Sequence, residues 1–132
     1  MRGDFGAYID QKRKGRGPDG SDILLRDLAK AIGNISVSYL SDIIKGRRNH
    51  QDKKYLEIIA SELHLNTDES GEMYDLAGRE RDEAAPDFPG YIMDERLPLV
   101  RVALRKANKK GIRDDFWKRV AEEIAKNGGS NE

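Results

Sequence analysis

Residues 28–48 read LAKAIGNISVSYLSDIIKGRR, and their pattern indicates how the first half of the chain folds. Apolar residues recur at helical spacing on both sides of Gly33, which interrupts the first apolar stripe, and Ser36 is suited to cap a second helix. Glycine favours the end of a helix, so the second helix is expected to stop at Gly46. The apolar positions are Leu28, Ala29, Ile32, Leu40, Ile43 and Ile44. The pattern predicts two short helices joined by a tight turn.

The second helix of this pair has small polar residues on its expected outer face and cations directly after its end. Arg47 and Arg48 follow Gly46 without a break. A helix that is held by its neighbour and flanked by cations suits the major groove of DNA, with phosphates alongside. We therefore predict a helix-turn-helix that binds double-stranded DNA. The serines of this helix also fit ordinary capping and surface positions. An ordinary helical hairpin without a DNA partner therefore stays open as an alternative.

Composition restricts the possible classes of protein. The chain has 132 residues, of which 37% are hydrophobic and 36% charged, as expected for a small helical protein with a thin core. It has no cysteine, which excludes disulfides and thiolate metal sites and suggests a reducing, cytoplasmic location. No membrane segment or signal peptide is expected. We find no phosphate-binding glycine loop, nucleophile elbow or metal motif, so we expect no enzyme, cofactor or metal site.

Charge is distributed unevenly although the net charge is zero. Residues 1–65 contain 12 Lys and Arg against 9 Asp and Glu, whereas residues 66–132 contain 12 against 15. The cations of the first half cluster at residues 12–16 and 45–48. The basic half is also the half with the helix-turn-helix pattern, which agrees with a nucleic-acid partner. Cations also suit helix C-termini, and both explanations can hold together.

Apolar periodicity organises the rest of the chain into helices. Further helices are expected over about 4–14, 53–63 and 67–78, with Thr67 as the cap of the last one and Gly78 at its end. With the central pair, this makes five short helices around one core. We predict an all-α fold in which residues 1–79 form the DNA-binding domain.

Residues 80–132 are predicted to form a helical extension with two amphipathic helices. A chain of this size seldom holds a core of its own, so its apolar faces must pack on the first domain or on another subunit. A homodimer would bury these faces and double the number of recognition helices. The expected interface consists of Leu99, Val102, Phe116, Trp117 and Val120. The alternative is that Phe116 and Trp117 cover the first domain of the same subunit.

The segment from Phe5 to Gly78 resembles the lambda-repressor-like, XRE-type family of helix-turn-helix regulators. The resemblance rests on Leu28-Ala29, Gly33, Ser36, Tyr39-Leu40-Ser41, Ile43, Gly46 and Arg48, followed by Leu56, Ile59-Ala60 and Leu63. It implies a five-helix domain that binds a twofold-symmetric operator as a dimer and represses transcription. It also implies a recognition helix from Ser36 to Lys45.

The resemblance assigns roles to individual residues. Side chains on the outer face of the recognition helix would meet base edges, and those at its flanks would approach the DNA backbone. Arg16, in a loop that is longer than usual for the family, could reach a phosphate or the minor groove. The predicted DNA-binding residues are Ser36, Val37, Ser38, Tyr39, Ser41, Lys45, Arg47, Arg48 and Arg16.

A further departure from the family pattern and an alternative function accompany this prediction. Asn34 and Ile35 both stand between the glycine and the capping serine, one residue more than usual, so a shift of the recognition helix is expected. The alternative function is a protein-interaction module, such as an antitoxin, whose C-terminal helices bind a regulatory partner protein.

Overall fold

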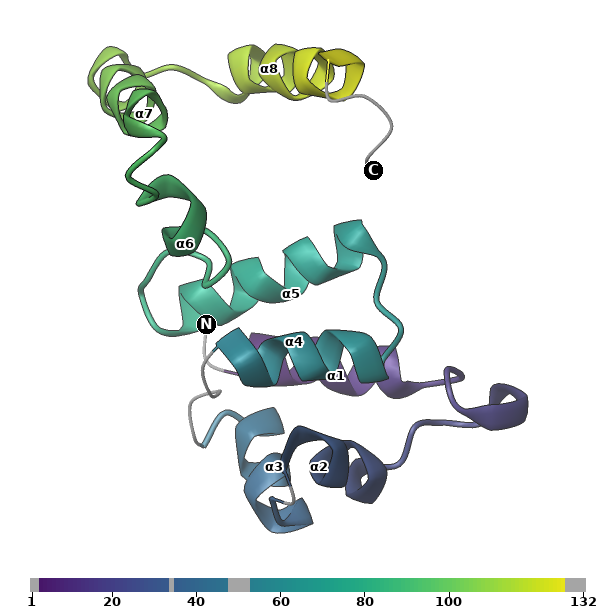
Figure 1. Cartoon of the computed structure of the whole chain (residues 1–132). Helices are drawn as coiled ribbons and strands as arrows, with labels where there is room; N and C mark the ends of the chain where they lie inside the picture. The colour runs from purple at the N-terminus through teal and green to yellow at the C-terminus, as the bar shows by residue number, and fades with distance from the viewer. Residues whose placement is uncertain (1–2, 34, 48–52, 128–132) are drawn as a thin grey trace. The chain divides into compact units, whose positions relative to one another are not determined.

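The computed structural model describes residues 3–33, 35–47 and 53–127, and all regular elements in these ranges are helical. Arg48 and the extra turn residue Asn34, both named in the sequence predictions, lie outside the described residues. The chain divides into two compact units, Met1–Gly90 and Tyr91–Glu132 (Figure 1). The boundary predicted from the sequence, between residues 79 and 80, lies inside a helix of the first unit.

Unit 1 contains the five predicted helices, and the predicted all-α class is confirmed. A short 3-10 turn (Pro18–Gly20) lies between the first two helices, where the long loop was expected. The helices are α1 (Asp4–Arg13), α2 (Leu25–Gly33), α3 (Val37–Ile44), α4 (Lys53–Glu62) and α5 (Thr67–Glu80). Helix α1 packs against α3 and α5, and α2 packs against α3 and α4. Helix α3 is therefore held from two sides.

One hydrophobic core joins all five helices of unit 1. The stripe predicted for α2 and α3 lies in it, as do the apolar faces of the other three helices. Its buried members are Phe5, Ile9, Leu28, Ala29, Ile32, Leu40, Ile43, Leu56, Ile59, Leu63, Met73 and Ala77. Burying a large apolar side chain stabilises a fold by about 1.5–3 kcal/mol, so this core is the main source of stability for the domain.

Two expectations about α5 are wrong. Its cap is Asn66 and not Thr67: the Asn66 side chain accepts from the Glu69 N–H at 2.8 Å, and Glu69 accepts from the Asn66 N–H at 3.1 Å. This reciprocal pair is a capping box. Gly78 does not end the helix, which continues to Glu80. A β-carbon at Gly78 would lie 2.8 Å from the Glu83 carbonyl oxygen. Glycine therefore allows the backbone of residues 83 and 84 to pack closely against α5.

Unit 2 contains two longer helices, and a short helical turn crosses its boundary with unit 1 along the chain. Helix α6 (Pro89–Ile92) leads into it, and α7 (Pro98–Lys110) and α8 (Asp114–Asn127) follow, separated by a turn at Gly111 with φ 64°. No side chain in the described part of unit 2 is buried. No helix in the described ranges of the chain has the length and apolar character needed to cross a membrane.

Candidate nucleic-acid interface

Helix α3 has one buried and one exposed face. Leu40 and Ile43 point into the core, where both are buried. On the other side, Val37 is 43% exposed, and Ser38 and Lys45 are exposed as well. Ser41 lies on the same outer side and is half-buried. The structure thus brings four of the predicted DNA-binding residues together on one outward face.

The start of α3 is held by its capping residue. The Tyr39 N–H donates to Ser36 Oγ at 3.0 Å, as the sequence predicted for a serine at this position. The Tyr39 side chain is half-buried and packs against the core. Ser36 and Tyr39 therefore stabilise the start of α3, and their predicted contacts with DNA would come in addition to this structural role.

The end of α3 carries an ion pair that the sequence reasoning missed. Arg47 has a side chain that is 68% exposed, and its Nη1 lies 3.6 Å from Asp42 Oδ1. The Arg47 N–H also donates to the Asp42 carbonyl at 2.9 Å, around Gly46 with φ 77°. Asp42 follows Ser41 directly, so a helical wheel of α3 would have placed this acid beside the predicted contact face. Arg47 thus presents its charge with a carboxylate beside it.

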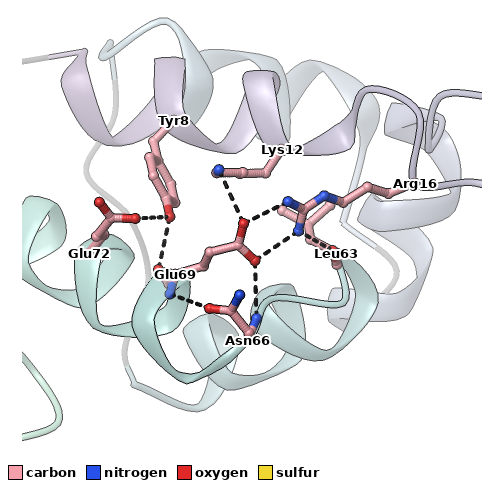
Figure 2. A network of polar contacts seen from close by, with 7 residues as sticks. All are labelled: Tyr8, Lys12, Arg16, Leu63, Asn66, Glu69 and Glu72. Atoms are coloured by element: carbon pink, nitrogen blue, oxygen red, sulfur yellow. Dashed lines mark hydrogen bonds and ion pairs between the residues drawn. The ribbon is translucent and has the colours of Figure 1, made fainter.

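Arg16, another cation predicted to reach DNA, forms an ion pair with α5. Its guanidinium donates to both carboxylate oxygens of Glu69, at 2.7 and 3.1 Å, and to the Leu63 carbonyl at 3.2 Å (Figure 2). Lys12 Nζ lies 3.2 Å from the same carboxylate. The hydrogen bond from Arg16, followed by that from the Asn66 N–H, lowers the pKa of Glu69 to about 2. The partner is 53 positions away along the chain, so local spacing could not reveal it.

Tyr8 completes this network between α1 and α5. Its hydroxyl lies 3.0 Å from both the Glu69 carbonyl oxygen and a Glu72 carboxylate oxygen (Figure 2). Burial, and then the hydrogen bond to Glu72, raise the pKa of the Tyr8 hydroxyl. The Lys12 ammonium lies 5.2 Å from the centre of the Tyr8 ring, within cation–π range. Several polar contacts therefore fasten α1, which supports α3, to the start of α5.

The predicted dimer-interface residues all lie on α7 and α8. Leu99 is 77% exposed, Val102 and Phe116 are also exposed, and Trp117 and Val120 are half-buried. The rings of Phe116 and Trp117 meet edge to face, with centroids 5.2 Å apart. A groove of about 440 Å³ runs along both helices and is lined by Ala103, Lys106, Ala107, Lys110, Ile112, Phe116, Trp117 and Val120. The interface itself stays a prediction.

The fold and the exposed face of α3 define the class of the first domain, a helix-turn-helix. Comparison with known families agrees: a family model described as helix-turn-helix matches residues 21–70, from the loop before α2 to the first turn of α5. The matched segment is therefore similar to the lambda-repressor-like, XRE-type helix-turn-helix domains, which are DNA-binding regulatory domains. No curated protein and no solved structure matches the chain.

Proposed function

We propose that this protein is a sequence-specific transcriptional repressor that binds a twofold-symmetric operator as a dimer. The observation that carries the proposal is the placement of α3 within the matched helix-turn-helix segment. Its apolar face is buried, and Val37, Ser38 and Lys45 are exposed on the opposite face. A supported helix with an exposed polar face is the element that such domains insert into the major groove.

The side chains of this face suit different parts of the duplex. Ser38 and Ser41 can exchange hydrogen bonds with base edges, and Val37 can contact a thymine methyl group. Lys45 and Arg47 suit phosphates, which position the helix without reading sequence. Arg48, outside the described residues, is proposed to act in the same way. Because serine and valine discriminate weakly between bases, DNA shape would supply part of the specificity.

Dimerisation is proposed to occur through unit 2. The described part of this unit buries no side chain, although α8 carries Phe116, Trp117, Val120 and Ile124. Pairing with the same helices of a second chain would remove this apolar surface from water. It would also bring two recognition helices onto one operator, about one helical turn, ~34 Å, apart.

Selection of bound sequences from a random duplex pool tests the proposal. A symmetric consensus with half-sites separated by about 10 bp supports it, and failure to enrich any sequence contradicts it. Lys45→Gln/Arg47→Gln should weaken binding to all duplexes. The control variant Arg79→Gln/Lys126→Gln also removes one Arg and one Lys, from α5 and α8, and should leave duplex binding unchanged.

A second candidate function is an antitoxin-like interaction module. The groove between α7 and α8 favours it, since this groove could accept an apolar segment of a partner protein instead of a second copy. Sedimentation of the full chain separates the two functions. A concentration-dependent dimer supports the repressor, whereas a monomer that binds no palindromic duplex supports the interaction module.

A further inference from the structure

Most cations of unit 1 that the structure describes are close to a carboxylate. The ion pair between Arg16 and Glu69 is 2.7 Å long, and Arg47, at the end of α3, is 3.6 Å from Asp42. The paired cations are Lys12, Arg13, Arg16, Arg26, Arg47, Lys53 and Arg81. A neighbouring carboxylate reduces the attraction of a cation for a phosphate. The proposed DNA-reading unit therefore offers less positive charge than its sequence suggests.

Helix α7 shows the opposite pattern. Residues 97–113 contain six Lys and Arg and no Asp or Glu, although the half of the chain that includes them is acidic overall. Arg105, Lys106, Lys109 and Lys110 are exposed, and none forms an ion pair with another described residue. Arg101 donates to the carbonyls of Ile92 and Asp94, at 2.6 and 3.0 Å, and so anchors the start of the helix. Unit 2 thus presents unneutralised positive charge.

These cations form two rows along α7. Arg101, Arg105 and Lys109 follow one another at intervals of four residues, as do Lys106 and Lys110. Residues four apart lie above one another on a helix, about 6 Å along its axis. Lys106 and Lys110 line the groove toward α8, next to Ala107, whereas Arg105 and Lys109 do not line this groove.

We infer that the basic face of α7, formed by Arg105, Lys106, Lys109 and Lys110, is a second DNA-contacting surface that binds the phosphate backbone. The inference rests on the proposed function. A row of long, exposed cations suits sequence-independent contacts with phosphates, each of which releases a counterion. Once α3 engages a duplex, its phosphates are at high effective concentration for α7 of the same chain. An acidic protein is the other partner that this charge could attract.

The test is the salt dependence of duplex binding by the full chain. Arg105→Gln/Lys109→Gln removes two charges, and Arg105→Lys/Lys109→Arg keeps them. Lys118→Gln/Lys126→Gln is the matched control on α8. The slope of log K against log salt is negative, and each lost phosphate contact reduces its magnitude by about 0.9. The first variant should therefore reduce the magnitude by about 1.8 per protomer. The charge-conserving variant and the control should keep the wild-type slope.

The outcomes separate this inference from the proposed function. If the wild-type chain binds duplex with a strong salt dependence and the Arg105→Gln/Lys109→Gln slope is unchanged, the inference is overturned while the proposed function stands. An acidic protein then becomes the partner to seek. If the wild-type chain binds no duplex, both fail together. Circular dichroism shows whether the variants retain their helices, and the Arg105→Lys/Lys109→Arg variant distinguishes loss of charge from loss of packing.

Discussion

The backbone of Gly6, in α1, lies directly against the carbonyl group of Ile44, the last residue of α3. A β-carbon at Gly6 would overlap the Ile44 carbonyl oxygen. Gly6 is buried and lies beside Phe5, whose side chain is in the core. The close approach of α1 thus determines where the proposed recognition helix ends, and with it the position of Lys45 and Arg47.

Gly6→Ala is expected to destabilise the protein and to weaken DNA binding. Overpacking at a close contact costs about 1–3 kcal/mol, more than the roughly 1 kcal/mol that alanine contributes through helix propensity. Urea denaturation measures the first effect, and duplex titration of the folded variant measures the second. Gly71→Ala is the control, because a β-carbon at Gly71 in α5 meets no atom within 4 Å. That variant should be stabilised by about 0.5–1 kcal/mol. A similar change in the free energy of unfolding for Gly6→Ala and Gly71→Ala would contradict the role assigned to Gly6.

The contribution of Glu69 to stability should disappear in acid. Its pKa is lowered from 4.5 in an unperturbed carboxyl to about 2 in the folded chain, first by Arg16. A folded-state pKa below the unfolded value stabilises the fold above the unfolded pKa, and this stabilisation is lost as the pH falls toward the folded pKa. The stability difference between wild type and Glu69→Gln should therefore be constant above about pH 5 and shrink between pH 4.5 and 2.

Urea denaturation of both proteins across this pH range is the measurement for Glu69. Glu57→Gln provides the matched control, because Glu57 pairs with Lys53 at 3.8 Å and both side chains are about half exposed. Such a surface pair contributes about 0–1 kcal/mol, so the control should change stability little at any pH. A Glu69→Gln effect that stays the same from pH 7 to pH 2 would rule out the charge pairing as its source.

Asp42→Asn should strengthen binding to duplexes of any sequence. The substitution removes the carboxylate beside Arg47 and a negative charge from the outer side of α3. Its effect should be largest at low salt, because surface charges are screened beyond about 10 Å at 0.1 M. Titrations of specific and random duplexes measure it, with Asp75→Asn on α5 as the control. A loss of affinity for one sequence alone would instead assign Asp42 to base reading, for example of cytosine N4.

Phe116→Ala should weaken self-association if unit 2 forms the dimer. Phe116 is 39% exposed on α8, and aromatic residues at the centre of an interface often contribute 2 kcal/mol or more. The dimer Kd should rise at least tenfold, which corresponds to about 1.4 kcal/mol. Sedimentation equilibrium measures this change, with Tyr91→Ala, in the same unit and outside α7 and α8, as the control. Equal dimer Kd values for Phe116→Ala and wild type would show that Phe116 does not lie in the dimer interface.

Local patterns in the sequence predicted much of unit 1 correctly. The apolar spacing of Leu28, Ile32, Leu40 and Ile43 identified the core faces of α2 and α3, and Ser36 was recognised as a cap. These features depend on residues within one or two helical turns, so periodicity reveals them. The cap of α5 was misplaced by one residue because Asn66 and Thr67 are both suitable, and the reciprocal contacts of Glu69 decide between them.

Local patterns were enough to predict the helix-turn-helix, the outward positions of Val37, Ser38 and Lys45, and the basic character of residues 97–113. Which charged side chains are available to a partner depends on contacts between distant parts of the chain. Arg16 is bound by Glu69, and Arg47 is accompanied by Asp42. Arg105, Lys106, Lys109 and Lys110 of α7 have no such partners among the described residues. The reason is physical: an ion pair depends on distance in space, and the fold brings residues 53 positions apart within hydrogen-bonding range.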